Sequence, residues 1–542
     1  MTMKQLIAVC MCVLFAPAVA WAQAEQHQHD MAGMAPKDIG TVSFETSCSP
    51  DVKTRFNEAV ALLHSFWFNE SRAAFEAVLK QDPSCAMAYW GIALTHWGNP
   101  FAGQRSPQTI ANGKAAIDKG VATGSPTARE KGYLEAVGIL FSSNDVTTQR
   151  QRVLDYEKAM GRVSVGNKAD TEARIFWALA VAQAASPTDK TYARQLQAAE
   201  MLEPLFKQMP NHPGLAHYII HAYDVPMLAP KALNAARSYA GIAPVVPHAL
   251  HMPSHTFTRV GYWKESVESN ARSAKTAEET NGIGEAMHAR DYMTYAYLQM
   301  GMDTQAKENL ARVEQLAKGT GGTQGAAGAG PNTFAMAAIP ARYAMERQQW
   351  QDALSLQPNP APGTPYTEAI TYFVRAVGAA RAGKPDAATA DIAKLTALRD
   401  REIEMKDEYW AQQVDIQKRG AEAWQWFAQG KKAEGLAAMK EAAAIEDSTE
   451  KAAVTPGPIA PARELLGYML LENTQPKEAL VEFEAVMKKE PNRFLAIWGA
   501  AKAAEATKQT ARAKGLFTQL VEMCKDAGPE RPELQYARKM AK

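Results

Sequence analysis

Residues 211–224 read NHPGLAHYIIHAYD, and residues 247–257 read PHALHMPSHTF. Each stretch contains two histidines four residues apart, namely His217 and His221 in the first and His251 and His255 in the second. The two pairs are offset by 251 − 217 = 34 residues, so they occupy the same register of a repeating unit. Side chains four residues apart lie on one face of a helix, and repeats of about 20 to 50 residues form solenoids. The spacing therefore predicts an all-α solenoid with histidine pairs in adjacent repeats.

The same register is visible where the chain has no histidine pair. Residues 52–85 place small side chains at Ala59 and Ser71 and an aromatic ring at Phe75. A unit near the C-terminus repeats the aromatic position with Phe483. About nine units of this kind are visible, which makes the repeat the main organising feature of the chain.

Two blocks carry a resemblance to a known family. They are SCSPDVKTRFNEAVALLHSFWFNESRAAFEAVLKQDPSCAMAYWGIAL (47–94) and GPIAPARELLG (457–467), and they resemble the tetratricopeptide repeat family, in particular a group of exported bacterial members of unclear function. The resemblance implies a right-handed superhelical solenoid of antiparallel helix pairs. It also implies that one set of positions on the first helix of each unit lines a concave groove, where a protein or peptide partner binds.

Seven side chains fall on these groove-lining positions in three successive units. They are His217, His221, His248, His251, His255, His288 and Asp291. Imidazole nitrogens bind copper and zinc at about 2 Å, and helices packed about 8 to 10 Å apart let facing side chains share an ion. The sequence therefore predicts a copper or zinc site in which the two histidine pairs share one ion. Pro253 is expected to kink the helix between His251 and His255.

Two other functions fit the same residues. The first is a metal-free scaffold that binds a protein or peptide in the groove. The second is a metalloenzyme that uses the cluster, with Asp224, Glu285 or Asp291 as acid or base. The chain has no G-x-S-x-G, no HExxH and no phosphate-binding glycine loop, which disfavours the common hydrolase and nucleotide-binding designs. Whether the protein is an enzyme stays open at this stage, and the balance favours a protein that is not.

Composition limits the partners. The chain has 542 residues, of which 46% are apolar and 22% charged, and its formal net charge is +1. Such a chain is typical of a globular protein and has no basic field for nucleic acid. Beyond the N-terminus, no apolar run approaches the length of a membrane span.

The N-terminal residues are predicted to direct export. Residues 1–22 carry one lysine, a short apolar run and a small-x-small end, which is typical of a cleaved signal peptide and predicts a periplasmic or secreted protein. Residues 23–47 are predicted to form a flexible leader. Its His27, His29, Met31 and Met34 are suitable copper ligands.

Export also favours a disulfide between cysteines of the mature chain, because disulfides form in oxidising compartments. Cys48 and Cys85 flank the first repeat and are predicted to pair, which leaves Cys524 as a free thiol.

The predicted arrays are 48–318 and 334–542, joined by a Gly-rich linker at 319–333. Residues 103–165 fit the repeat pattern poorly and are predicted only as helical.

Overall fold

The computed structural model describes residues 36–319, 332–528 and 531–542. The predicted signal peptide, residues 23–35 of the predicted leader and nearly all of the Gly-rich linker lie outside these residues. Within the described ranges every regular element is a helix and none is a strand, which confirms the all-α prediction.

Most helices are followed by an antiparallel partner that packs on them. In residues 36–319 they are α1 (Pro36–Ile39), η2 (Pro50–Val52), α2 (Lys53–His64), α3 (Phe68–Gln81), α4 (Ala86–Trp97), α5 (Pro107–Thr123), α6 (Ala128–Leu140), η3 (Val146–Thr148), α7 (Gln149–Gly166), α8 (Thr171–Gln183), α9 (Ala193–Gln208), α10 (Pro213–Ala222), η4 (Ala229–Ala232), α11 (Leu233–Ile242), α12 (Pro247–His251), α13 (Pro253–Arg259), α14 (Trp263–Glu279), α15 (Ile283–Gln299) and α16 (Asp303–Gly319).

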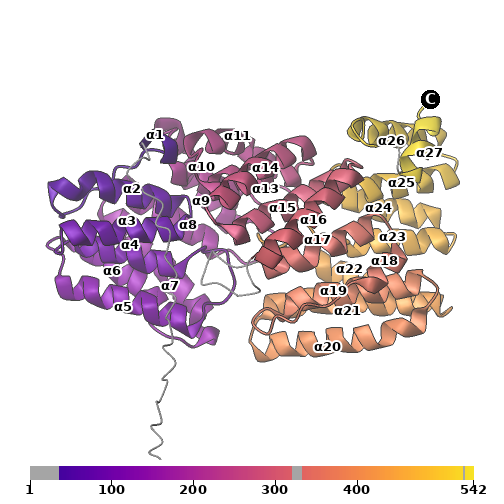
Figure 1. Cartoon of the computed structure of the whole chain (residues 1–542), viewed down its shortest axis with the longest axis horizontal. Helices are drawn as coiled ribbons and strands as arrows, with labels where there is room; N and C mark the ends of the chain where they lie inside the picture. Colours follow the sequence, from indigo (N-terminus) through magenta and orange to yellow (C-terminus); the bar gives the residue numbers. More distant parts are fainter. Residues whose placement is uncertain (1–35, 320–331, 529–530) are drawn as a thin grey trace, which may run out of the picture. The chain divides into compact units, whose positions relative to one another are not determined.

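In the remaining residues they are α17 (Thr333–Glu346), α18 (Trp350–Ser355), α19 (Pro365–Arg381), η5 (Pro385–Ala387), α20 (Ala388–Glu404), α21 (Glu408–Ala428), α22 (Lys432–Asp447), α23 (Ala462–Glu472), α24 (Pro476–Lys489), α25 (Phe494–Ala506), α26 (Thr510–Met523) and α27 (Pro532–Met540). Successive helices pack on one another along the chain, which is the arrangement of a helical-repeat solenoid (Figure 1).

Residues 103–165 belong to the same architecture, although the repeat pattern predicts them only as helical. α5 packs on α4, and α6 and α7 form a hairpin of their own. The irregular segment between Trp97 and Pro107 delays the start of α5. This extra segment shifts the register, which explains why the 34-residue spacing fails there.

The turn inside a helix pair requires a left-handed backbone in many units. Gly261 and Gly301 have φ of 72° and 68°, and Thr474 and Lys508, which are 34 residues apart, have φ of 59° and 60°. In the first unit this position is Phe66, with φ of 55°. A bulky residue in this region is strained, and such strain is concentrated at functional sites.

The small residues of the repeat pattern make room for its aromatic residue. A Cβ atom on Gly91 would lie 2.3 Å from the ring of Phe75, and one on Gly499 would lie 2.3 Å from the ring of Phe483. Both rings are fully buried. The sequence signature is therefore a packing requirement between neighbouring helices.

The packed chain begins earlier than the sequence analysis predicts. The sequence places residues 38–47 in the flexible leader, but Ile39, Val42 and Phe44 are buried. The backbone N–H of Phe44 donates to Asn57 Oδ1 at 3.0 Å. Apolar side chains at alternate positions let this extended segment bury one face against the first helices.

Cys48 and Cys85 are joined by a disulfide in the structure. The bond connects the segment that precedes α2 to the residue that precedes α4, so it encloses the first helix pair. Cys524 is a free, buried thiol.

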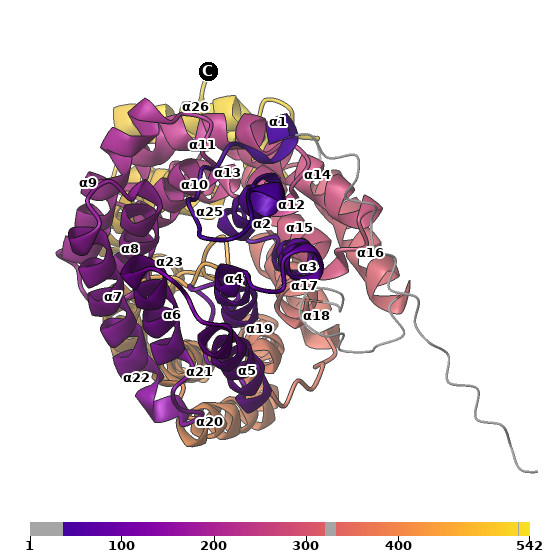
Figure 2. The same cartoon turned by 90° about the vertical axis from the view of Figure 1, so that its left-hand side faces the viewer.

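Segments far apart in sequence also meet. Trp263 Nε1 donates to Asn492 O at 2.8 Å, and the Tyr295 hydroxyl donates to Glu490 Oε2 at 2.8 Å. Arg531 forms a buried ion pair with Asp303. α25 accordingly packs against α15, and the two helices lie in the same part of Figure 2. The two arrays predicted on either side of residues 319–333 thus belong to one compact unit.

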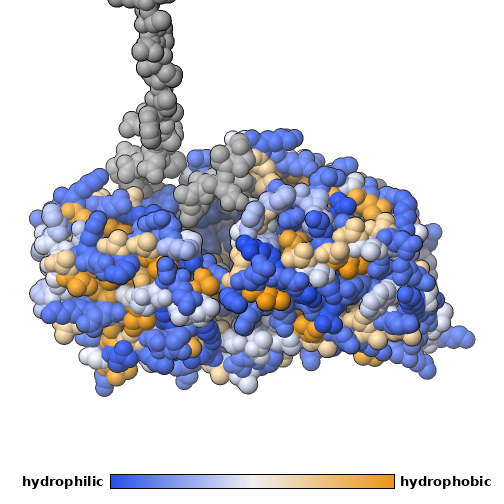
Figure 3. All heavy atoms as spheres, turned by 90° about the horizontal axis from the view of Figure 1, so that it is seen from below, coloured by the Kyte–Doolittle hydropathy of each residue, from blue (hydrophilic) through white to orange (hydrophobic). Residues whose placement is uncertain are grey.

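No helix in the described part of the chain is long and apolar enough to cross a membrane. The face in Figure 3 is mainly hydrophilic, with hydrophobic residues scattered among the hydrophilic ones.

Candidate metal centre

Four helices bring six of the chain's histidines together. α10 carries two of them, α12 and α13 carry three, and α15 carries one: His217 and His221, then His248, His251 and His255, then His288. Neighbouring rings are in contact along the whole set, with centroids 5.0 Å apart for His217 and His248 and 4.4 Å apart for His251 and His288. Four of the six are buried, and His248 and His288 are partly buried. We call these six residues the histidine cluster.

Pro253 does not separate the second pair, contrary to the expectation of a disruptive kink. It ends α12 and begins α13, but Met252 between them keeps helical angles, with φ of −53° and ψ of −35°. His251 and His255 therefore stay on one face, and their Nε2 atoms lie 3.0 Å apart.

The donor atoms fall into two groups of three. His217, His221 and His248 form the first triad, and His251, His255 and His288 form the second. Within each triad one nitrogen per residue lies within 4.8 Å of the others. This grouping differs from the predicted one, in which His217, His221, His251 and His255 share one ion, because His248 and His288 complete two separate sets.

Asp291, the seventh predicted ligand, has a different partner. Its Oδ1 atom accepts a hydrogen bond from Arg342 Nε at 2.8 Å, and both side chains are fully buried. The pKa of Asp291 is raised by burial, which Arg342 opposes. An aspartate held in this way stabilises the packing of α15 against α17.

Hydrogen bonds fix the tautomers of His251 and His255 in the second triad. His251 Nδ1 lies 2.6 Å from Asn270 Oδ1, and the Asn270 amide nitrogen donates to Ser266 O at 2.7 Å. The amide oxygen therefore faces His251, so Nδ1 of His251 carries the proton. His255 Nδ1 lies 2.9 Å from Asp224 Oδ2, and this carboxylate accepts a hydrogen bond from the Nδ1–H of His255 in the same way.

In neutral imidazoles this leaves the Nε2 atoms of His251 and His255 without protons, facing one another at 3.0 Å. The Tyr292 hydroxyl lies 3.4 Å from His255 Nε2, but its proton is engaged with the backbone carbonyls of Ala453 and Thr455 at 3.0 and 3.1 Å. Two lone pairs at this distance repel, and a cation between them removes the repulsion.

The first triad has the same kind of support. His217 Nδ1 donates to the backbone carbonyl of His64 at 2.6 Å, and its Nε2 atom lies 3.2 Å from Nε2 of His248. Nε2 of His221 is buried without a hydrogen-bond partner among the described residues. The ring of Phe66 lies against His217 with centroids 4.3 Å apart, so the strained turn residue covers this triad.

His64 belongs to a separate buried network. Its Nε2 atom and Nε2 of His212 each lie 2.9 Å from the carboxylate of Glu172, and the Tyr218 hydroxyl contacts its Nδ1. Burial opposes ionisation of Glu172, but the two histidines lower its pKa to about 2. These three residues are close enough to hold an ion, yet the His64 nitrogens are already occupied. The network positions the His64 carbonyl that orients His217.

Asp224 is the charged centre beside the second triad. Arg259 Nε donates to its Oδ1 at 2.9 Å, and Lys451 Nζ lies 3.7 Å from the same oxygen. Burial raises the pKa of Asp224, but Lys451, Arg259 and His255 hold it well below its ordinary value. Burial, reinforced by Arg259, lowers the pKa of Lys451 to about 8.

Burial also lowers the pKa of every histidine in the cluster. The largest effect on each ring is desolvation, and neighbouring rings add to it for five of the six. For His255 burial lowers the pKa in spite of Asp224. The pKa of His288 falls to about 3. The rings are therefore neutral at pH 7, the form in which imidazole binds metals.

The loop between α22 and α23, residues 448–461, lies beside the second triad. Lys451 from this loop is almost completely buried, with 7% of its side chain exposed. Arg342 donates to the carbonyls of Gly457 and Pro458 at 3.1 Å. The loop also contacts α15, because the Tyr292 hydroxyl donates to the carbonyls of Ala453 and Thr455.

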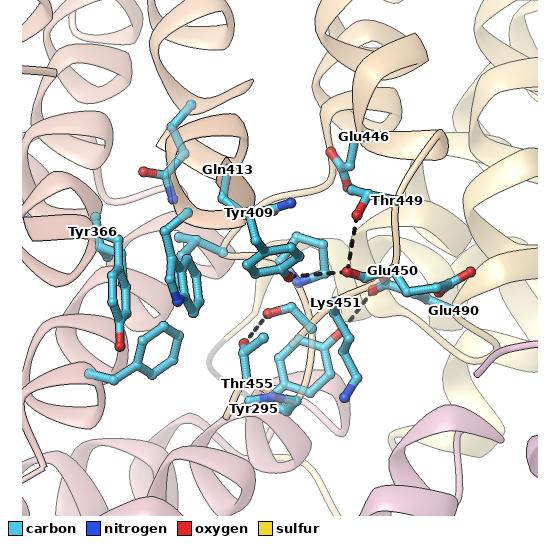
Figure 4. Close-up of a pocket in the computed structure, with 18 of the residues that line it drawn as sticks. Tyr295, Tyr366, Tyr409, Gln413, Glu446, Thr449, Glu450, Lys451, Thr455 and Glu490 are labelled. Carbon is cyan, nitrogen blue, oxygen red and sulfur yellow. Dashed lines mark hydrogen bonds between the residues drawn. The ribbon is translucent and has the colours of Figure 1, made fainter. Parts of the chain in front are cut away.

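A cavity of about 80 Å³ is lined in part by this loop. Tyr366 and Trp410 stack along one wall with ring centroids 3.7 Å apart, and Glu446, whose pKa is raised to about 7 by burial, lies on another. Figure 4 shows Lys451 among the side chains that line the cavity, with Glu450 and Thr455 of the same loop nearby. Because Arg259 and Lys451 line the cavity and also contact Asp224, it adjoins the support of the second triad.

The remaining acid or base candidate is Glu285, one helical turn before His288. Burial, reinforced by Glu70, raises its pKa to about 7. Of the three carboxylates proposed for acid or base chemistry, Asp224 and Asp291 form ion pairs with arginines. Glu285 is the one whose pKa lies near 7.

Several supporting residues were not predicted from the sequence. Asn270 lies 19 residues after His251 on the partner helix, and a polar residue at that buried position was a usable signal. Lys451 comes from a loop 451 − 224 = 227 residues beyond Asp224, and no sequence pattern connects them.

Comparisons with known proteins locate similar folds only. No family model matches the chain, and no curated protein matches it. Among solved structures, the P58(IPK) TPR domain is 14% identical over 85% of this chain and 99% of its own, with a TM-score of 0.22. The human IFIT1 dimer with m7Gppp-AAAA is 8% identical over 81% of this chain and 90% of its own, with a TM-score of 0.34. At these TM-scores the superpositions carry no functional argument.

Proposed function

We propose that this protein is an exported tetratricopeptide-type solenoid whose histidine cluster binds a transition metal, copper or zinc. The observation that carries the proposal is the pair of facing nitrogens in the second triad. Nε2 of His251 and Nε2 of His255 lie 3.0 Å apart, while Asn270 and Asp224 take the proton of each ring on the other nitrogen.

Protonation of one ring would also remove the repulsion between these two nitrogens, but burial disfavours the protonated form. Burial keeps the pKa of both rings below the ordinary value for histidine, so both rings are mainly neutral at pH 7. In a tetrahedral site with bonds of about 2.0 Å, two ligand nitrogens lie about 3.3 Å apart. The separations of 3.0 and 3.2 Å in the two triads are close to this value.

The supporting contacts are of the kind that metal-binding histidines require. A ligating imidazole usually donates its other N–H to a carbonyl or carboxylate, which fixes the ring and the tautomer. His217 donates to a backbone carbonyl, His251 to an amide oxygen and His255 to a carboxylate. The location outside the cytoplasm rests on the sequence of residues 1–22 and fits the disulfide of Cys48 and Cys85.

Metal binding is tested by equilibrium dialysis of the chelator-treated chain against Zn²⁺ and, separately, Cu²⁺. The background carries His27→Ala and His29→Ala, so that the leader does not contribute. The H251A/H255A variant is expected to lose at least a hundredfold in affinity at the second triad, and the matched control His96→Ala, which removes a histidine outside the cluster, is expected to bind normally.

Equal binding by the H251A/H255A variant and by its parent would refute the proposal. The metal-free partner-binding scaffold would then be the better account of the fold.

A further inference from the structure

We propose that the histidine cluster holds two transition-metal ions, one in each triad, and this inference rests on the proposed metal-binding function. The six rings do not converge on one point. The two closest pairs of ring nitrogens, His217 with His248 and His251 with His255, each belong to a single triad.

Each triad is complete enough to bind an ion by itself. Three imidazoles per ion is a common donor set at zinc and copper centres, and it leaves a coordination position open. In each triad the three donor atoms lie within 4.8 Å of one another, and an ion with bonds of about 2 Å draws its ligands to within about 3 to 4 Å. Small side-chain rotations therefore suffice in both triads.

The two triads are oriented by independent groups. The first depends on the His64 carbonyl and on the Phe66 ring from the α2 turn. The second depends on Asn270 from α14 and on Asp224 from the loop after α10. Separate supports are expected for two sites, because a single shared ion needs only one rigid set of ligands.

Charge limits which ions occupy the pair of sites. Lys451 and Arg259 lie beside the second triad, and Asp224 is the carboxylate that faces both of them. Asp291 is neutralised by Arg342. Two divalent ions add more positive charge than this environment balances, whereas two Cu⁺ ions add half as much. Cu⁺ is therefore the first probe, and Zn²⁺ is the second.

The test counts ions per chain. The chelator-treated full-length chain with His27→Ala and His29→Ala is loaded anaerobically with excess Cu⁺, or in parallel with Zn²⁺, then desalted and analysed for metal. We expect two ions per chain with at least one of the two metals. His248→Ala and His288→Ala are each expected to leave one ion, and the double variant none.

His248 and His288 are chosen because they are the two partly buried members of the cluster, so alanine disturbs the packing least there. Circular dichroism and melting verify that each variant is folded, and His96→Ala is the matched control that keeps two ions. One ion in the parent chain, lost in either variant, would overturn the two-ion inference and leave the metal-binding proposal standing. No retained ion in the parent chain would overturn both.

Discussion

Asn270 fixes the proton on His251 because its own amide is fixed by Ser266. Asn270→Ala removes that acceptor, so His251 can carry its proton on the nitrogen that faces His255. We expect metal affinity to fall by about 10-fold to 100-fold, the usual effect of removing an outer hydrogen-bond partner. Isothermal titration with the metal that the parent chain binds measures the change.

The matched control is Asn309→Ala. Asn309 is buried on α16 and donates to the Arg290 carbonyl and the Thr294 hydroxyl, so its loss also removes buried hydrogen bonds. Both variants are expected to lose about 1 to 3 kcal/mol of stability, but Asn309→Ala should keep its metal affinity. Equal affinities in the two variants would show that Asn270 has no role at the site.

Acid is expected to destabilise the metal-free chain through the cluster. The folded-state pKa of His288 is about 3, below the ordinary value of about 6.5 that it has when unfolded. The unfolded chain therefore binds more protons between these values, and stability falls as the pH drops through 6.5. For His288 the loss between pH 7 and pH 5 is at most about 2 kcal/mol.

Urea unfolding of the chelator-treated chain at pH 7 and pH 5 measures this effect. His288→Ala should lose less stability between the two pH values than the parent chain does. If acidification costs both chains the same free energy, His288 is not held neutral by the fold.

At the scale of elements, the loop 448–461 brings a positive charge to the cluster. Lys451 is buried beside Asp224, and it lowers the pKa of His251, His255 and His288 by electrostatic repulsion. The same repulsion acts on a bound cation. Lys451→Met keeps the apolar stem and removes the charge, so we expect tighter metal binding at pH 7.

The effect of Lys451→Met should depend on pH with a defined sign. The pKa of Lys451 is about 8, so the parent chain loses this charge as the pH rises above that value. The affinity difference between parent and variant is therefore largest near pH 7 and should disappear near pH 9.5. Competition with a metal indicator dye across this range measures it. A constant difference would mean that the variant acts through packing.

At the scale of the whole molecule, the repeat period predicted the fold because it reflects local packing. Phe75 needs Gly91 beside it, and Phe483 needs Gly499, so each unit carries its own requirement in sequence. The contacts that join distant units, such as the ion pair of Asp303 with Arg531, do not recur at the repeat spacing in the sequence. The sequence therefore predicted the helices and their order, but not their closure into one unit.

The candidate site was likewise predictable where it depends on local helix geometry and not where it depends on contacts between distant helices. The repeat register predicts that all six histidines lie on one face, because the position of a residue around its own helix depends only on local sequence. It did not predict which ones group together, since that depends on how α10, α12, α13 and α15 approach one another. Asp291 was predicted as a ligand from its register alone, and its ion pair with Arg342 depends on a helix that begins beyond the Gly-rich segment.

The central claim is that metal joins neighbouring repeats through the cluster, and the melting temperature tests it most directly. Ligands from α10, α12, α13 and α15 come from successive helix pairs, so a bound metal stabilises the folded chain by mass action, by about 3 kcal/mol at a hundredfold excess over its Kd. We predict that metal raises the melting temperature of the chelator-treated chain. H217A/H255A, which removes one ligand from each triad, should abolish the increase, and H27A/H29A should leave it unchanged. An undiminished increase in H217A/H255A, with full metal content, would contradict the account.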